Sequence, residues 1–165
     1  IFMRYHDITK CDMKNGDGLR TVLWGAGCSH RCPGYHNPIT WDPHDGIPFD
    51  QAAKEEIFEE LSKDYVSGIT LSGGDPLFPG NRDTIAEMID EIKERFPGKT
   101  IWLYTGYLWE DVKDLPGISK GDVLIDGPYV EALRDTTLHW KGSSNQRVID
   151  VPSTLQAGQV ILWDE

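Results

Sequence analysis

The residues with the clearest potential for chemistry lie in one glycine-rich segment, where Cys28 and Cys32 stand four positions apart. Thiolates at this spacing can bind two irons of one iron–sulfur cluster, and neighbouring glycines allow the tight backbone that this needs. Two free cysteines in a surface loop explain the pair equally well. A zinc site that adds one or two histidines is a further alternative, although the spacing matches no standard zinc finger. The candidate histidines are His30, His36 and His44.

A second segment of interest is the sequence Ser72-Gly73-Gly74-Asp75-Pro76. Two consecutive glycines let a ligand approach the backbone closely, and the free N–H and C=O groups at a strand end can bind the ammonium or carboxylate of an amino acid. An isolated Gly-Gly-Asp-Pro is more often a simple turn. Its place directly after an expected strand favours a binding role.

Two further polar segments, Asn15–Arg20 and Trp140–Arg147, read as turns when each is taken alone.

The composition narrows the classes of partner. The chain has 165 residues and a net charge of −11, from 16 Lys and Arg against 27 Asp and Glu, without any Lys/Arg run. The negative electrostatic field of such a chain repels phosphate backbones and anionic lipids, so we expect neither a nucleic-acid nor a membrane partner. No stretch approaches the ~20 apolar residues of a membrane span, and the N-terminus lacks the apolar region of a secretory signal. We expect a cytoplasmic protein with one domain over residues 1–165.

The hydrophobic pattern predicts elements that position these segments. Short β-branched or aromatic runs alternate with runs of helical period, which is typical of parallel βα units. Asp50 is expected to cap the first helix and Asp83 the second, which Pro97-Gly98 ends. The expected strands are Thr21–Trp24, Ile69–Leu71, Thr100–Tyr104, Asp122–Ile125 and a terminal Gln159–Trp163, and the expected helices span 51–64, 84–96 and 109–115.

Ligands of parallel α/β folds bind at the carboxyl ends of the strands. The loops expected there are Gly25–Phe49, Ser72–Pro76, Thr105–Tyr107 and Asp126–Tyr129. Each combines glycine with polar or aromatic residues. We therefore expect these loops to converge on one site.

Taken together and in order, these segments resemble one family. The resemblance rests on Asn15–Arg20, Gly27–Trp41, Leu71–Pro76, Trp102–Tyr107, Asp126-Gly127 and Trp140–Gln146. The chain is similar to the activating proteins of anaerobic ribonucleoside-triphosphate reductase, which are small radical S-adenosylmethionine enzymes of the glycyl-radical activase group. The likeness extends from about Met3 to Arg147.

The resemblance implies an α/β fold of the radical S-adenosylmethionine type, a partial (β/α) barrel with an open parallel sheet. It also implies a [4Fe–4S] cluster held by a Cys-x3-Cys-x2-Cys loop, with one iron left open for S-adenosylmethionine. Reductive cleavage of that molecule would give a 5′-deoxyadenosyl radical, which would generate a glycyl radical on the glycyl-radical subunit of the reductase. The family further implies a flavodoxin-type electron donor.

The sequence departs from the family pattern at the third cluster ligand, because position 35 is tyrosine. A phenol, with an ordinary pKa near 10, loses its proton less readily than a thiol near 8.5, and its ring is bulkier. Tyrosinate does bind iron in some haem proteins. We expect this chain to keep the fold but to bind the cluster poorly and to be weakly active or inactive. His36 or Cys11 are candidate replacement ligands.

The family's site residues can be carried over position by position. Cys28 and Cys32 would be the catalytic cluster ligands, with Tyr35 at the third position. The backbones of Gly34 and His36 would lie against the adenine end of S-adenosylmethionine. Gly73 and Gly74, with Asp75, would receive the methionine amino group, and Thr105 and Asp126 would contribute to the methionine carboxylate side or to a nearby cation. Asp17 and Arg20 would lie near the partner's glycine loop. Asn145 and Gln146 would close the mouth of the site.

Three alternatives to this assignment stay open at this point. The chain could activate another glycyl-radical enzyme such as pyruvate formate-lyase, although the usual members are longer and Trp140–Gln146 favours the reductase. It could be a cluster-deficient, non-catalytic subunit that only docks on the reductase. It could also be a zinc-binding module.

Overall fold

The computed structural model describes residues 3–27, 46–135 and 137–163. In these residues the strands form one seven-stranded mixed sheet in the order β3-β1-β2-β4-β5-β6-β7. The strands are β1 (Arg4–Asp12), β2 (Arg20–Gly25), β3 (Ile47–Pro48), β4 (Gly68–Gly73), β5 (Thr100–Tyr104), β6 (Val123–Asp126) and β7 (Arg147–Asp150). The helices are α1 (Gln51–Leu61), α2 (Arg82–Arg95), α3 (Trp109–Val112) and α4 (Val151–Ala157). Three short 3₁₀ turns cover Pro79–Asn81, Ile118–Lys120 and Glu131–Leu133.

The centre of the sheet is parallel and its edges are antiparallel. Strands β2, β4, β5 and β6 run parallel to one another, whereas β1 pairs antiparallel with β2 and β7 pairs antiparallel with β6. The two outermost strands of this order, β3 and β7, leave the sheet open. An α/β protein with an open, partly parallel sheet is therefore confirmed.

The helices begin and end close to the predicted positions. The carboxylate of Asp50 accepts the backbone N–H of Ala53 at 3.0 Å and caps α1 as expected. Asp83 does not cap α2, because that helix begins one residue earlier and Asp83 lies in its first turn. There it still interacts favourably with the positive end of the helix dipole.

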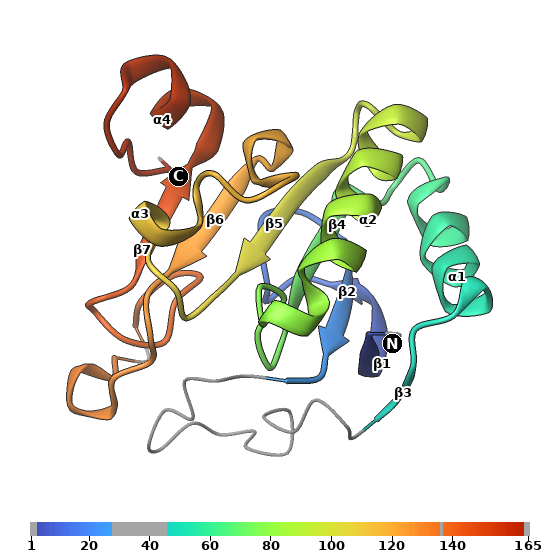
Figure 1. The fold of residues 1–165 in the computed structure, drawn as a ribbon, viewed down its shortest axis with the longest axis horizontal. Coiled ribbons are helices and arrows are strands. Elements are labelled where there is room, and N and C mark those ends of the chain that lie inside the picture. The colour runs from blue at the N-terminus through green and yellow to red at the C-terminus, as the bar shows by residue number, and fades with distance from the viewer. Residues whose placement is uncertain (1–2, 28–45, 136, 164–165) are drawn as a thin grey trace.

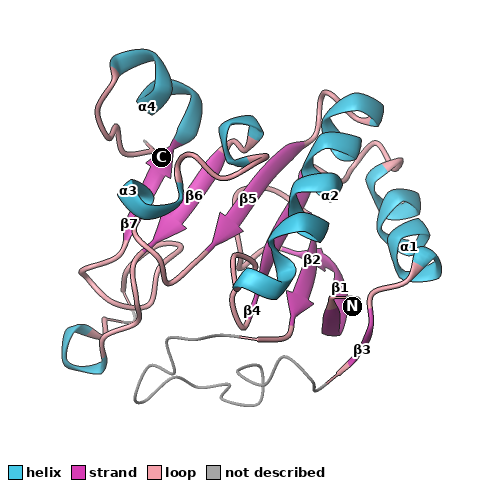
Figure 2. Ribbon diagram, in the orientation of Figure 1, coloured by secondary structure: helices cyan, strands magenta, loops and turns pink. Residues whose placement is uncertain are grey.

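The main hydrophobic core lies between the sheet and the helices. Figure 1 shows α1 and α2 on the same face of the sheet, and Figure 2 shows the strands behind them. Alternate strand residues such as Leu23, Leu71 and Leu103 point to this face and pack with Ile57 and Met88 of the helices. A strand's period of two sends the intervening residues to the opposite face.

The opposite face carries a second, aromatic cluster. Trp102 lies under Trp140 and Trp163, with ring centroids 5.4 and 5.1 Å away. Val123 and Ile125 of β6 complete the buried part of this cluster. The C-terminal segments thus cover part of the face that lacks the long helices.

The ends of the chain differ most from the sequence-based expectation. Strands β1 and β7 and helix α4 were not predicted. The expected terminal strand Gln159–Trp163 is wrong, because Leu162 forms only an isolated bridge with Ile149. In the described part of the chain, no helix is both long and apolar enough to cross a membrane.

Candidate functional site

The carboxyl ends of the parallel strands meet at one edge of the sheet, as predicted, and the segment Gly25–Gly27 is fixed there. The N–H of Gly74 donates to the carbonyl of Gly25 at 3.0 Å, and the N–H of Asp75 donates to the carbonyl of Gly27 at 2.6 Å. Gly27 directly precedes Cys28. The chain that leads into the cysteine loop is therefore bonded to the diglycine segment.

The cysteine loop itself lies outside the described residues. This applies to Cys28, Cys32, Gly34, Tyr35 and His36, and also to His30 and His44.

The diglycine segment is shaped by its neighbouring strand. Gly73 has a φ of +108°, and a Cβ at this position would lie 2.4 Å from both the nitrogen and the oxygen of Gly25. An L side chain cannot be placed there without moving the backbone of β2. The sequence argument attributed the glycine to ligand approach, whereas here the close contact is with the neighbouring strand.

Asp75 is fully buried and joins two of the strand-end loops. One carboxylate oxygen accepts the N–H of Leu77 at 2.9 Å and the hydroxyl of Thr105 at 2.8 Å. The other accepts the N–H of Gly106 at 2.9 Å. The structure thus brings Asp75 and Thr105 together, with the threonine hydroxyl donating to the carboxylate.

Asp126 is also fully buried, at the end of β6. Its carboxylate accepts the N–H of Trp109 at 2.9 Å and is paired with the guanidinium of Arg147, whose Nε lies 3.1 Å away. This carboxylate raises the pKa of Arg147, because it stabilises the charged form of the guanidinium. Asp126 therefore connects β6, β7 and the start of α3.

Arg20 lies at the opposite end of the sheet from the diglycine segment. It pairs with Gly68 at the start of β4, whereas Gly73 pairs with Gly25. Its guanidinium is buried and donates to the hydroxyls of Thr70 and Thr100. Burial lowers the pKa of Arg20 to about 10, so the side chain stays cationic at neutral pH. Asp17, whose carbonyl accepts from Arg20 at 2.9 Å, is at this same end.

Asn145 and Gln146 are tied to the loop that follows β6. The amide of Asn145 donates to the carbonyl of Pro128 at 2.8 Å, and that of Gln146 donates to the carbonyl of Gly127 at 3.0 Å. The segment before β7 is thereby held at the carboxyl end of β6. These two residues therefore lie at the same end of the sheet as Gly73 and Asp75.

A pocket of about 310 Å³ opens on the face of the sheet away from α1 and α2. Its floor comes from the last outward-facing residues of three neighbouring parallel strands, Trp24, Ser72 and Tyr104. Burial raises the pKa of Tyr104, so its phenol stays neutral over the physiological range. The rest of the wall is formed by Lys14, Asn15, Tyr129, Leu138, Trp140, Lys141, Gly142 and Gln146.

Of these pocket residues, the sequence analysis predicted only Gln146 as an individual site residue, although most of the others lie in segments that it singled out. Trp24, Ser72 and Tyr104 occupy the strand positions that alternate with the core residues. That alternation is a usable signal, because polar or bulky residues at the last such position of neighbouring strands must share one face.

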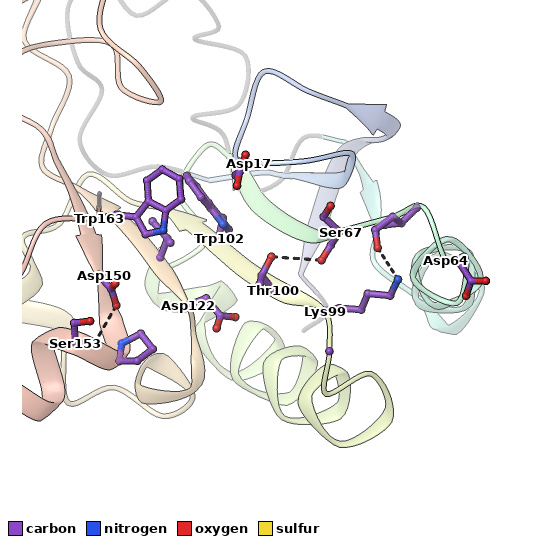
Figure 3. A pocket seen from close by; sticks show the side chains of 14 residues that line it. Asp17, Asp64, Ser67, Lys99, Thr100, Trp102, Asp122, Asp150, Ser153 and Trp163 are labelled. Atoms are coloured by element: carbon purple, nitrogen blue, oxygen red, sulfur yellow. Dashed lines mark hydrogen bonds between the residues drawn. The ribbon is translucent and has the colours of Figure 1, made fainter. Parts of the chain in front are cut away.

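A larger pocket of about 780 Å³ lies at the amino ends of the parallel strands. Figure 3 shows Trp102 and Trp163 on one side of it, with Asp122, Thr100 and Lys99 at the starts of β6 and β5. Among the described residues, those that line this pocket do not belong to the strand-end loops of the sequence analysis. It lies at the sheet edge opposite Gly73.

Residues able to hold a metal are few in the described ranges, where no group of three or more His, Cys, Asp and Glu has a suitable arrangement. Cys11 is exposed in β1, near the end where Asp12 pairs with Arg20. Gly25, which leads toward the cysteine loop, pairs with Tyr5 at the other end of β1. The antiparallel pairing thus places Cys11 and Gly25, which leads into that loop, at opposite ends of β1.

The sequence of the chain matches known proteins over most of its length. A family model described as a 4Fe-4S single cluster domain matches residues 14–149. The anaerobic ribonucleoside-triphosphate reductase-activating protein of Enterobacteria phage T4 is 46% identical over 146 residues, covering 88% of this chain and 93% of its own. This chain belongs to the family of anaerobic ribonucleoside-triphosphate reductase-activating proteins.

Bacterial activating proteins of this family are similar over the same length. That of Escherichia coli K12 is 40% identical over 150 residues, with 88% of this chain and 97% of the relative covered. That of Vibrio cholerae is 36% identical over 151 residues, with 87% and 96% covered. The family assignment supports an iron–sulfur cluster, and the matched range contains Cys28 and Cys32.

The donor set in this chain fits such a cluster only in part. Of the three positions that the family likeness assigns to cluster ligands, Cys28 and Cys32 carry thiols and Tyr35 carries a phenol. The residues present therefore offer two thiol donors where the likeness implies three.

Proposed function

We propose that this chain is an oxidoreductase that activates the anaerobic ribonucleoside-triphosphate reductase by forming a glycyl radical on it. The bond between the N–H of Asp75 and the carbonyl of Gly27 carries the proposal, because it joins the diglycine segment to the residue before Cys28. The open sheet with four neighbouring parallel strands is compatible with the partial (β/α) barrel of radical S-adenosylmethionine enzymes.

The protein's part in this reaction is to bind and orient. When bound, the cluster would supply one electron for cleavage of S-adenosylmethionine into methionine and a 5′-deoxyadenosyl radical, which would take a hydrogen atom from the glycine Cα of the reductase to give 5′-deoxyadenosine and the glycyl radical. Cys28 and Cys32 would hold the cluster, and the backbones of Gly34 and His36 would flank the adenine. The backbone of Gly73–Asp75 would receive the methionine amino group. Thr105 and Asp126, at the ends of the neighbouring strands β5 and β6, would contribute to the methionine carboxylate side or to a nearby cation.

The pocket floored by Trp24, Ser72 and Tyr104 is where we place the glycine-bearing segment of the reductase. It opens at the same strand ends as the diglycine segment and is bordered by Gln146, as the family likeness suggested. Asp17 lies at the other end of the sheet from this pocket, so it would contact the reductase outside its glycine-bearing segment. Arg20 is not included, because its guanidinium is buried and bonded within the sheet.

Tyr35 should limit this function. With two thiolates, a second iron loses its protein ligand, and the phenol must ionise well below its ordinary pKa near 10 to replace the missing thiolate. We propose that the chain binds the cluster weakly and forms little glycyl radical while retaining its fold and its docking on the reductase. A flavodoxin-type protein would supply the electron.

The test is anaerobic reconstitution of the chain and of its Tyr35→Cys variant, followed by incubation with the reductase, S-adenosylmethionine and a reductant. We expect Tyr35→Cys to raise iron and sulfide toward four of each per chain, with a glycyl radical in the electron paramagnetic resonance spectrum. The unchanged chain should show clearly less of both. Tyr35→Ser is the matched control, because it removes the bulky ring without adding a thiol.

Other outcomes would assign a different function. A full cluster and a strong radical in the unchanged chain would contradict the impairment. Complex formation without a radical in Tyr35→Cys would favour a docking subunit, and radical formation only on another glycyl-radical enzyme would favour the other activases. Stoichiometric zinc without iron would favour a zinc-binding module.

A further inference from the structure

The segment Gly73–Asp75 is held by hydrogen bonds on both sides. On the side of β2, its backbone N–H groups donate to the carbonyls of Gly25 and Gly27. On the side of β5, the carboxylate of Asp75 accepts the hydroxyl of Thr105 and the N–H of Gly106. Three consecutive strand ends are therefore joined through Asp75.

Asn81 adds a second connection on the side of β2. Its side chain is 4% exposed, and its amide nitrogen donates to the carbonyl of Ala26 at 2.8 Å, with the carbonyl of Asp75 at 3.4 Å. Asn81 occupies the N-cap position of α2 but makes no capping bond with its side chain. The side chain of Asn81 therefore connects the start of α2 to the segment after β2 and does not cap the helix.

We propose that Asp75 and Asn81 are positioning residues, which fix the diglycine backbone relative to the chain entering the cysteine loop and do not touch S-adenosylmethionine. This inference rests on the proposed function. The carboxylate of Asp75 is 0% exposed and already accepts the N–H of Leu77, the N–H of Gly106 and the hydroxyl of Thr105. A carboxylate enclosed in this way would have to break these bonds to reach a methionine ammonium group.

The groups that bind S-adenosylmethionine are then the backbone atoms of Gly73–Asp75. The carboxylate of Asp75 changes the affinity for S-adenosylmethionine only by fixing the positions of these backbone atoms. Partners that orient a binding group typically change affinity by about 10–100-fold when they are removed. Asp75 is joined to the end of β5 and Asn81 to the segment after β2. Removing either should therefore loosen the same loop from different sides.

The experiment uses Asp75→Asn and Asn81→Leu in the full chain carrying Tyr35→Cys, so that a third thiol is present. Amide hydrogen exchange is measured on the metal-free protein, and S-adenosylmethionine affinity on the anaerobically reconstituted protein. We expect faster exchange in residues 73–77 for both variants, in 105–107 for Asp75→Asn, and at least tenfold weaker affinity for both. Thr105→Val removes the O–H donor to Asp75 and replaces Asp75→Asn if that variant fails to fold.

Asp90→Asn is the matched control, because it makes the same chemical change at an exposed carboxylate on α2 that pairs with Lys120. It should leave exchange in these loops and affinity at the parent values. Unchanged affinity in Asp75→Asn and Asn81→Leu would overturn the proposal. So would weaker affinity in Asp75→Asn alone with unchanged exchange, since that identifies a direct ligand. A Tyr35→Cys parent that fails to bind S-adenosylmethionine would instead refute the proposed function.

Discussion

Arg20 is a buried cation whose hydrogen bonds hold the amino ends of three parallel strands. Its guanidinium donates to the hydroxyls of Thr70 and Thr100 and to the carbonyls of Ile69 and Asp17. It also lies 5.5 Å from the ring centroid of Trp102. A planar group with five donors suits such a site, whereas an ammonium group does not.

We therefore predict that Arg20→Met lowers the free energy of unfolding by about 3 kcal/mol, because several buried acceptors lose their donor. Arg20→Lys should recover only part of this loss. Urea denaturation followed by circular dichroism measures both variants. Arg95→Met, on the exposed end of α2, is the control. A loss below 1 kcal/mol in Arg20→Met would contradict this structural role and reopen a role in partner binding.

Tyr104 gives a prediction for alkaline pH. Burial raises its pKa above the ordinary value of 10, so above pH 10 the unfolded chain releases a proton that the folded chain retains. The stabilisation from the neutral phenol is thus complete below pH 10 and is lost as the pH rises further. We expect Tyr104→Phe to show a shallower fall of stability between pH 9.5 and 11 than the parent, measured by urea denaturation at each pH. Equal slopes would indicate a solvent-exposed phenol.

At the scale of elements, the junction of β6, β7 and α3 depends on one ion pair. Arg147 pairs with the buried Asp126 and also with Glu110, at 2.8 Å, which lowers the pKa of Glu110 through the hydrogen bond. Removing one partner of a buried pair leaves an uncompensated charge and costs about 3–5 kcal/mol.

Arg147→Met is accordingly expected to destabilise the protein by roughly this amount, about 3–5 kcal/mol, when measured by urea denaturation. The double variant Asp126→Asn with Arg147→Met should recover part of the loss, because the isolated charge is gone. Glu110→Gln changes only the exposed partner and should cost less than about 1 kcal/mol. Additive losses in the double variant would show that the two residues are not coupled.

The elements that could be predicted from the sequence are those whose pattern has one dominant cause. Helix α2 and strands β4 and β5 carry a clear helical period or short β-branched and aromatic runs, and they were placed to within two residues. Strand β1 was missed because its residues are mostly half-exposed and polar, and its pairing with β2 compensates for this. Helix α4 did have a signal, since Asp150 accepts the N–H of Ser153 and Pro152 lies in the first turn.

The candidate site was predictable to the level of loops but not of individual contacts. Gly73, Gly74, Asp75 and Thr105 do meet at one sheet edge, because parallel strands bring their following loops together. The orientation of Asp75 toward Thr105 and the burial of Arg20 depend on tertiary packing, which no local pattern encodes. Asn81 was missed because its contact with Ala26 is a tertiary one, between residues far apart in the sequence.

At the scale of the whole molecule, the main core of the described residues is built from apolar side chains alone. That core extends from Met3 through Ile57 and Ile92 to Val151. It lies on one side of the seven-stranded sheet. Proteins whose folding depends on a metal, such as zinc fingers, lose their structure when the metal is removed. Here the apolar burial of about two dozen side chains should suffice.

We therefore predict that the metal-free chain stays folded. After anaerobic treatment with a chelator it should keep its near- and far-ultraviolet circular dichroism and unfold cooperatively on heating. The variant Cys28→Ser with Cys32→Ser should behave in the same way, since it removes both thiols of the loop but none of the described core. Loss of near-ultraviolet signal together with binding of a hydrophobic dye would mean that the cysteine loop is part of the folding unit. In that event, the weak cluster binding that we expect from Tyr35 would lower the stability of the fold as well as the activity.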